Sequence, residues 1–181
     1  TNLAPVADVV SDAGSFLYKR TYSGDPTVVA DFVATVTDAY AQKGVIVVVK
    51  HFPGHGSAPG DSHGGQVISD AGEFDFATVH LPPFKAALSA GAEGVMMAHI
   101  LVRAYDPEMP ASLSSTVIED VLRDGLGFSG LVVADDLEMA GAAVASAAGG
   151  GTPVPDDSPS DLAVLALAAG CDLLISTGTL P

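Results

Sequence analysis

An unbroken apolar run at residues 44–49 (GVIVVV) leads directly into a stretch dense in ionisable side chains, residues 50–63 (KHFPGHGSAPGDSH). A run of β-branched residues predicts a strand buried on both faces, as in a parallel sheet. Proteins with parallel α/β sheets keep their chemistry at the carboxyl ends of such strands. We therefore predict a strand at residues 45–49 and a candidate active site in the loop that follows it.

Apolar runs alternate with helical patterns along the rest of the chain. Five strands are predicted, at residues 2–10, 45–49, 94–98, 130–134 and 172–175. Helices are predicted from Pro26 to the residues before Gly44, at 81–90, at 114–124 and from Asp161 to the residues before Gly170. Strands that alternate with helices imply right-handed βαβ crossovers and a parallel sheet.

The predicted helix after Asp25 carries recognisable end signals. Asp25 is a good N-cap, Pro26 fits the first turn and Gly44 stops the helix. Its apolar residues recur at helical spacing: Val28, Val29, Phe32, Val36 and Tyr40. Residues 140–160, rich in Ala, Gly and Pro, are instead predicted to be a flexible loop inside a single partial domain that spans residues 1–181. Asp161 is then expected to cap the last helix.

Ionisable residues lie near or just after the carboxyl ends of four of the five predicted strands, namely Asp8, Lys50 with His51, His99, and Asp135 with Asp136. Their clustering at one end of the sheet favours the mouth of a (β/α)8 TIM barrel. Because about five βα units cannot close eight strands, we expect an α/β fold of this type that is incomplete. A doubly wound open sheet is the alternative, but no glycine-rich nucleotide-binding motif supports it. The first residues resemble the middle of a fold, so the chain is expected to be an excised, processed or truncated piece.

Composition narrows the classes of protein that fit. The 181 residues are 48% hydrophobic, enough for one domain with a core, and the net charge of −15 argues against nucleic acid as a partner. No apolar stretch reaches the roughly 20 residues that a membrane span needs. The single cysteine, Cys171, excludes an internal disulfide and is expected to be a buried thiol. The sequence does not distinguish a cytoplasmic protein from a secreted one.

Two motifs carry a specific resemblance. KHFPGHG at residues 50–56, followed by DSH at 61–63, resembles the signature of family 3 glycoside hydrolases, in the β-N-acetylhexosaminidase branch that recycles peptidoglycan sugars. Weaker matches follow the same order along the chain: NLAPVADV at 2–9, Arg20 before Asp25-Pro26, MMAHI at 96–100, ASLS at 111–114 and VVADDLEM at 132–139.

The resemblance implies that Asp135 is the catalytic nucleophile and that His63 is the general acid/base. Asp61 would orient and charge His63, and Asp136 would have a supporting role. A carboxylate at a strand end can attack an anomeric carbon and form a covalent glycosyl-enzyme. A histidine in the acid/base role departs from the common pair of carboxylic acids, but an adjacent carboxylate favours the imidazolium that supplies the proton.

The resemblance also implies that Lys50, His51 and Arg20 bind the hydroxyl groups of the sugar. A lysine at the end of a buried strand is costly unless it is paired, which favours a functional role. Two interpretations of His99 stay open: it lines the floor of the pocket, or it is a hydrogen-bonded core histidine. No cofactor is expected.

The same loop could instead hold a metal ion. His51, His55, His63 and Asp61 are ligand types suited to zinc. However, the spacing of the histidines lies in a Gly/Pro-rich loop and no glutamate is placed as in the H-E-x-x-H motif, so we predict no metal site. His55 is then expected to be structural, and His80 to lie on the surface.

The predicted function is a retaining hydrolase that removes terminal β-linked N-acetylglucosamine from muropeptide or chitin-type substrates. Within the family, a phosphorylase or a β-glucosidase is the alternative. An inactive truncated fragment is a further alternative, since the family's first barrel strands, with another substrate-binding aspartate, have no counterpart here. An incomplete barrel exposes strand edges and apolar helix faces, so self-association or a covering partner is expected.

Overall fold

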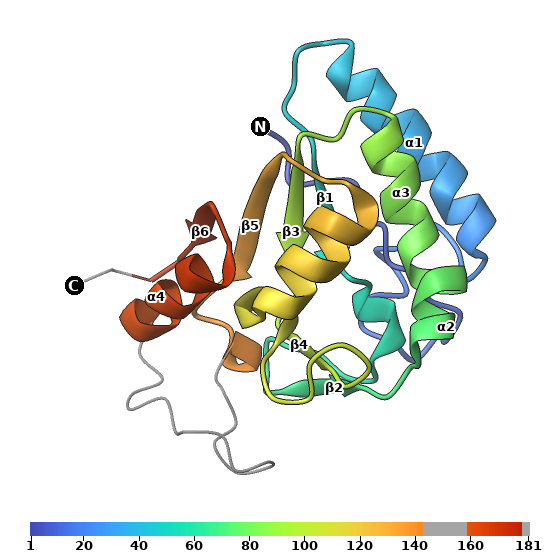
Figure 1. Cartoon of the computed structure of the whole chain (residues 1–181). Coiled ribbons are helices and arrows are strands. Elements are labelled where there is room, and N and C mark those ends of the chain that lie inside the picture. Colours follow the sequence, from blue (N-terminus) through green and yellow to red (C-terminus); the bar gives the residue numbers. More distant parts are fainter. Residues whose placement is uncertain (143–158, 179–181) are drawn as a thin grey trace.

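A four-stranded parallel sheet forms the centre of the computed structural model of the chain, which describes residues 1–142 and 159–178 (Figure 1). Its strands stand in chain order: β1 (Val48–Phe52), β3 (Gly94–Met97), β5 (Leu131–Asp136) and β6 (Leu173–Ile175). Residues 2–6 extend the sheet beyond β1 through two parallel bridges, Asn2 with Val47 and Val6 with Lys50. Strands that neighbour each other in sequence and in space are arranged as in a barrel wall, whereas a doubly wound sheet reverses its order at a switch point.

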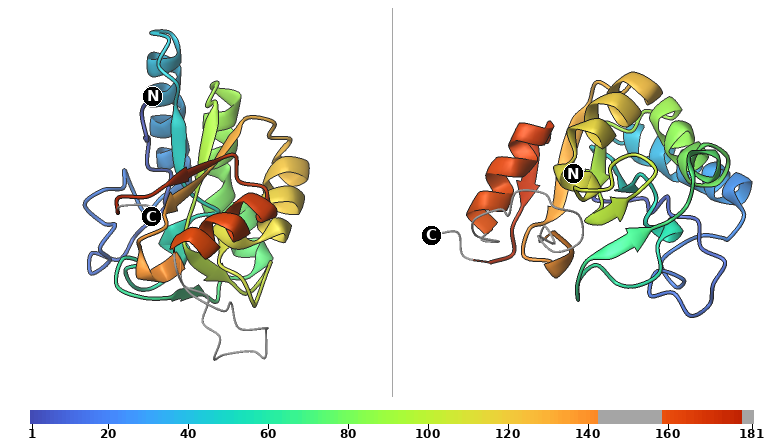
Figure 2. Two further views of the ribbon diagram at one scale, coloured as in Figure 1. Left: turned by 90° about the vertical axis from the view of Figure 1, so that its left-hand side faces the viewer. Right: turned by 60° about the horizontal axis from the view of Figure 1, so that its bottom comes forward.

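The helices lie in an arc on one side of this sheet, as both views in Figure 2 show. The longer helical segments are α1 (Pro26–Ala41), η2 (Phe76–His80), α3 (Leu81–Ser89), η4 (Thr116–Asp124) and α4 (Pro159–Ala169). Shorter turns are α2 (Glu73–Asp75), η1 (His55–Ser57), η3 (Ala111–Leu113) and η5 (Ala140–Ala142). Helices on one face only, with consecutive parallel strands, form part of a (β/α)8 barrel, as predicted.

The two faces of the sheet bury different residues. The main core lies between the sheet and the helices and includes Val49, Val95 and Val132. A smaller cluster of Val48, Met96 and Val133, with Ile175 against it, lies on the opposite, inner face. Because successive side chains of a strand alternate between faces, this pattern sets which later residues of β1 and β5 point inward.

The strands predicted at 94–98, 130–134 and 172–175 are confirmed as β3, β5 and β6. The other two predicted strands differ from the prediction. The strand predicted at 45–49 begins three residues later, at Val48, so it includes Lys50 and His51. Residues 2–10 make isolated bridges rather than a continuous ladder. A separate two-stranded parallel sheet, β2 (Val67–Ser69) with β4 (Ile100–Val102), was not predicted, because three-residue strands carry too short a pattern to recognise.

The N-terminal cap of α1 is confirmed, but its predicted apolar stripe is wrong. The Asp25 carboxylate accepts a hydrogen bond of 2.8 Å from the backbone N–H of Thr27. The buried face consists of Val29, Val33 and Thr37, whereas Phe32 is 52% exposed and stacks on Tyr22. The apolar residues of this helix therefore cover two sides, and the sequence pattern does not distinguish the side that meets the core.

The helix predicted at 81–90 begins earlier than expected. Helical structure runs from Glu73 through η2 into α3, and His80 consequently lies inside it. His80 is 8% exposed, so the prediction that it lies on the surface is wrong. Its side chain is buried because Gly54 packs against it so closely that a Cβ at Gly54 would lie 2.7 Å from the Cβ of His80.

Both ends of the segment predicted to be a loop, 140–160, lie in helical structure. Residues 140–142 form η5, and α4 already begins at Pro159, so Asp161 lies in the first turn and is not the cap. An acidic side chain in this position still interacts favourably with the helix dipole. Residues 143–158, to which the rest of this prediction refers, lie outside the described residues.

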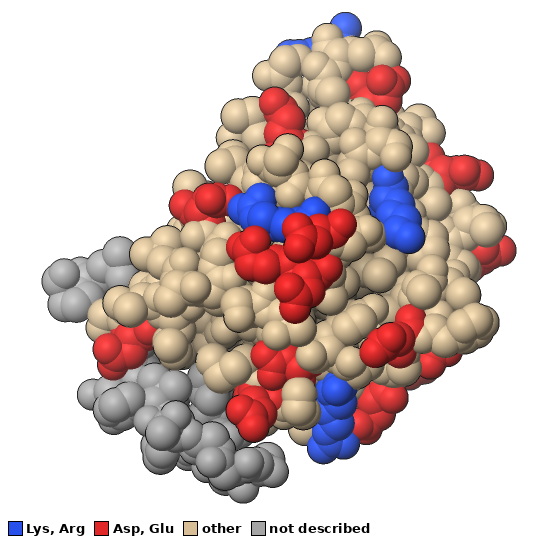
Figure 3. Space-filling view, in the orientation of Figure 1, with Lys and Arg blue, Asp and Glu red and all other residues tan. Residues whose placement is uncertain are grey.

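Acidic side chains outnumber basic ones on the face of the molecule shown in Figure 3, in keeping with the net charge of −15. Cys171 is buried as predicted, and burial raises the pKa of its thiol to about 12. Among the described helices, none is long and apolar enough to cross a membrane. At the α4–β6 end of the sheet, Val164, Leu167 and Leu173 are exposed. Self-association through such surfaces stays a prediction.

Candidate active site

Lys50 and Asp135 lie on the inner face of the sheet, at the carboxyl ends of β1 and β5. Each follows by two residues a member of the inner cluster, Val48 and Val133 respectively, so strand alternation directs both side chains to that face. Burial lowers the pKa of Lys50, the charge of Asp135 raises it, and the charge of Arg20 lowers it, so that the net pKa lies below its ordinary value. Because Asp135 and Arg20 both act on Lys50, we refer to these three predicted site residues as one electrostatic cluster.

Asp8 is a fully buried carboxylate that holds the start of the KHFPGHG segment. It is 0% exposed, and its Oδ2 accepts hydrogen bonds from Nδ1 and the backbone N–H of His51, at 2.7 and 3.3 Å. Its Oδ1 accepts one from the backbone N–H of His55, at 2.7 Å. The sequence pattern puts Asp8 near the end of a predicted strand but assigns it no role.

These bonds decide which nitrogen of His51 is free. Burial raises the pKa of Asp8, but the charge of His51 and the hydrogen bonds from His51 and His55 more than offset it, so the pKa lies below its ordinary value. An ionised carboxylate only accepts hydrogen bonds, so Nδ1 of His51 carries a proton. Nε2 is therefore the ring atom that remains for a ligand.

Replacing Asp8 with asparagine is expected to destabilise the fold by about 3 kcal/mol at pH 7, since it removes a buried charge and places an amide N–H against N–H donors. Because the pKa of Asp8 is lower when folded, its stabilisation is complete above the ordinary value of 3.8 and is lost as the pH falls below it. The difference between wild type and Asp8→Asn in urea unfolding should thus shrink in acid. An equal difference at pH 7 and pH 3 would contradict this assignment.

Asp61 and His63 form an exposed pair on the loop that follows β1. Their side chains are 48% and 59% exposed, and Asp61 Oδ1 accepts hydrogen bonds from Nδ1 and the backbone N–H of His63, at 2.6 and 3.0 Å. Burial raises the pKa of Asp61, and the hydrogen bonds from His63 more than offset it. The ionised carboxylate keeps the proton on Nδ1, so Nε2 of His63 is free to exchange a proton with a bound molecule.

His99 is a hydrogen-bonded core histidine, and the prediction that it contacts substrate is not supported by its position. It is 0% exposed; Nδ1 bonds with the Ser112 hydroxyl at 2.6 Å, and Nε2 donates to the carbonyl oxygen of Asp136 at 3.0 Å. Burial lowers the pKa of His99. Both ring nitrogens are hydrogen-bonded within the protein, so His99 holds the backbone of β5 in place next to Asp135.

The Asp136 side chain binds the segments that follow β5 and β6. Its carboxylate accepts hydrogen bonds from the hydroxyl and backbone N–H of Thr177, at 2.6 and 3.1 Å, and from the backbone N–H of Glu138, at 3.1 Å. Burial raises the pKa of Asp136, but these bonds lower it below its ordinary value. Asp136 thus organises the turn after β5, while its own backbone N–H donates to Asp135 Oδ1 at 2.9 Å.

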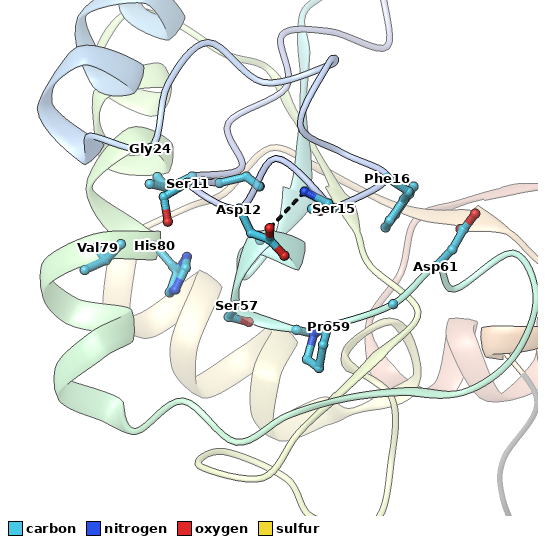
Figure 4. Close-up of a pocket in the computed structure, with 16 residues that line it drawn as sticks. Ser11, Asp12, Ser15, Phe16, Gly24, Ser57, Pro59, Asp61, Val79 and His80 are labelled. Atoms are coloured by element: carbon cyan, nitrogen blue, oxygen red, sulfur yellow. Dashed lines mark hydrogen bonds between the residues drawn. The ribbon is translucent and has the colours of Figure 1, made fainter.

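A cavity of about 620 Å³ lies between the loop at residues 54–61 and the segment at 9–16. Figure 4 shows His80 on one side of it and Asp61, near Phe16, on the other, with Asp12 between them. Lys50, His51 and Asp135 do not line this cavity. It therefore borders the loop that carries the Asp61–His63 pair and is separate from the sheet's electrostatic cluster.

Each histidine of the loop hydrogen-bonds a different partner, and their side chains do not form a shared ligand set. His51 bonds with Asp8, His55 Nε2 with the Ser62 hydroxyl at 2.8 Å, and His63 with Asp61. Within residues 1–142 and 159–178, no group of three His, Cys, Asp or Glu side chains could hold a metal ion. The alternative of a zinc site on this loop has no ligand set in the described part of the chain.

A parallel barrel wall with ionisable side chains gathered at its carboxyl edge is the architecture of the α/β-barrel enzymes. Comparison with known proteins identifies the family within this class. Residues 1–180 match the glycosyl hydrolase family 3 N terminal domain, and the chain belongs to that family.

The relatives agree in name. The chain is 37% identical to a beta-hexosaminidase of Stenotrophomonas maltophilia over 174 aligned residues. The aligned region covers 96% of this chain and 48% of the relative. It superposes on a family 3 beta-N-acetylglucosaminidase of Paenibacillus with a TM-score of 0.84 and 36% identity, over 97% of this chain and 32% of that one. A beta-N-acetylhexosaminidase of Beutenbergia cavernae gives 0.81 and 32%, over 97% and 51%. The chain thus spans about half the length of the curated relatives it matches.

Proposed function

We propose that the chain carries catalytic groups of a retaining glycoside hydrolase that removes terminal β-linked N-acetylglucosamine from muropeptide or chitin-type substrates. The observation that carries the proposal is the exposed Asp61–His63 pair, with Nε2 of the histidine free, on the loop after the strand that bears Lys50. The names of the relatives support the substrate class.

In the first step, the Asp135 carboxylate attacks the anomeric carbon of the bound sugar. The bond from that carbon to the leaving oxygen breaks, and Nε2–H of protonated His63 gives its proton to this oxygen. A covalent glycosyl-enzyme on Asp135 results. The electrostatic cluster suits the attack, since the Lys50 charge interacts with the Asp135 carboxylate, and Lys50 and Arg20 can also donate hydrogen bonds to sugar hydroxyls.

In the second step, the now neutral Nε2 of His63 takes a proton from water as the water oxygen attacks the anomeric carbon. The bond to Asp135 breaks and the carboxylate is restored. Two displacements at the same carbon leave the sugar with its original β configuration. His51 would offer only Nε2 to the sugar, because Asp8 occupies Nδ1.

The direct test is turnover of a chromogenic N-acetylglucosaminide by the purified chain, with the corresponding glucoside beside it. We expect the N-acetylglucosaminide to be cleaved at least about tenfold faster, a difference of roughly 1.4 kcal/mol in transition-state binding. Product analysis should show retained configuration. Faster cleavage of the glucoside would favour a β-glucosidase, and no turnover of either would favour an inactive fragment.

A phosphorylase of the same family is the second candidate, because a neutral histidine repels an incoming phosphate less than a carboxylate would. Inorganic phosphate would then replace water in the second step, attack the anomeric carbon and give a sugar 1-phosphate. Reactions in phosphate buffer and in phosphate-free buffer separate the two candidates. The hydrolase proposal expects free N-acetylglucosamine in both, whereas sugar 1-phosphate as the main product in phosphate would overturn it.

A further inference from the structure

Ser62 is buried in the middle of an otherwise exposed pair. It is 1% exposed, although the side chains of its two neighbours, Asp61 and His63, are 48% and 59% exposed. The loop therefore turns its serine into the protein and its acid/base candidates outward. A buried hydroxyl needs a hydrogen-bond partner, and that partner ties the pair to the rest of the structure.

The side chain of Ser62 is fastened to His55. The hydroxyl lies 2.8 Å from His55 Nε2, and the backbone N–H of His55 donates to the buried carboxylate of Asp8 at 2.7 Å. The His55 ring also packs edge-on against Phe16, whose ring contacts that of His63 as well. Asp8 holds His51 with its other oxygen, so one buried network links the proposed sugar-binding histidine to the loop that bears the acid/base pair.

The backbone of Ser62 is fastened on the opposite side, to the turn after β5. Its carbonyl oxygen accepts a hydrogen bond of 2.8 Å from the backbone N–H of Gly141. The approach is close: a Cβ at Gly141 would lie 2.7 Å from that oxygen and 2.9 Å from the carbonyl oxygen of His99. The same turn follows the strand that ends in Asp135 and Asp136. Ser62 therefore bridges the loop of the acid/base pair and the segment of the nucleophile.

We propose that Ser62 is a positioning residue, which acts through His55 and Gly141 to hold the Asp61–His63 pair at a fixed place relative to Asp135. The inference rests on the proposed function, because it assigns Ser62 to the acid step of that reaction. Proton transfer to a leaving oxygen depends on hydrogen-bond geometry, and a displacement of about 1 Å can cost on the order of 100-fold in rate. A Gly/Pro-rich loop without its side-chain anchor would sample many such displacements.

Ser62→Ala is the test, assayed on N-acetylglucosaminides with poor and with activated leaving groups. An alcohol leaving group needs the proton from His63, whereas a highly acidic phenol does not. We expect kcat/KM to fall about 10- to 100-fold for the poor leaving group and less than about threefold for the activated one. Amide hydrogen exchange in residues 55–63 should become faster. An equal loss on both substrates, or unchanged exchange, would overturn the proposal.

Four further variants separate this inference from its alternatives. His63→Ala tests the proposed function alone: without a leaving-group dependence in that variant, the acid role fails and the inference about Ser62 fails with it. Ser114→Ala is the matched control, because Ser114 is also 1% exposed and bonds the Asp106 carboxylate at 2.6 Å. It should lower stability without any dependence on the leaving group.

His55→Phe removes the same hydrogen bond from the other side and keeps an aromatic ring against Phe16. It should show the leaving-group dependence expected for Ser62→Ala. The proposal therefore stays testable if the serine variant does not fold. Ser62→Ala in a His63→Ala background should add less than about twofold, since residues that act as one unit are not additive. A full additional loss in that background would show that Ser62 acts independently of His63, contrary to the proposal.

Discussion

Asp135→Ala is expected to lower kcat/KM for an N-acetylglucosaminide by about 1000-fold or more, a loss of roughly 4 kcal/mol of transition-state stabilisation. Asp135 is half-buried on the inner face of the sheet, and its charge acts on Lys50. In the proposed mechanism, the variant lacks the carboxylate that forms the covalent intermediate. The fold should change little, because within residues 1–142 and 159–178 the Asp135 side chain accepts a single hydrogen bond, from the backbone N–H of Asp136.

Rescue and labelling distinguish a nucleophile from a residue that only supports the site. Azide added to Asp135→Ala should restore activity and give a glycosyl azide of inverted configuration, and a slow fluorinated substrate should label Asp135 in the wild type. Asp136→Asn is the matched control, since Asp136 follows directly but binds Thr177. It should lose less than about tenfold. A label on Asp136, or no rescue by azide, would refute the role of Asp135.

His63→Ala is expected to lower kcat/KM about 100- to 10,000-fold on substrates with poor leaving groups and far less on activated ones. Nε2 of His63 is the nitrogen left free by the bond of Nδ1 to Asp61, so its removal deletes the proton donor without disturbing a buried contact. Measurement of rate against the pKa of the leaving group gives the answer directly. Equal losses across the series would exclude the acid role.

The orienting role of Asp61 has a control in another exposed, ion-paired aspartate, Asp70. Asp61→Asn should produce a smaller version of the His63→Ala pattern, because the histidine keeps its ring but loses its ionised partner. Asp70 forms an exposed ion pair with Arg103 at 2.6 Å and has no bond to His63 among the described residues. Asp70→Asn should leave kcat/KM unchanged, as exposed pairs contribute little. A loss in the Asp70 variant comparable with that in Asp61→Asn would indicate a general charge effect.

Elements whose causes are local were predicted well. Asp25 caps α1 through a hydrogen bond to a residue two positions away. The apolar runs predicted to be buried strands form β3 and β5. The short strands β2 and β4 were missed because only their mutual pairing stabilises them. The buried side of α1 and the burial of His80 depend on neighbours from other segments, and there the sequence pattern misled.

The sequence by itself determined the family, the alternation of strands and helices, and the ionisable groups that stand at strand ends, because motifs and hydrophobic periods are properties of neighbouring residues. Only the tertiary structure decided how those groups are used. Asp8 and His51 lie 43 positions apart, yet a buried hydrogen bond of 2.7 Å selects the free nitrogen of that histidine. His99 became a support because β5 packs against it, and Ser62 became an anchor because His55 and Gly141 meet it. Burial and hydrogen bonding between distant segments set these roles, and no local pattern encodes them.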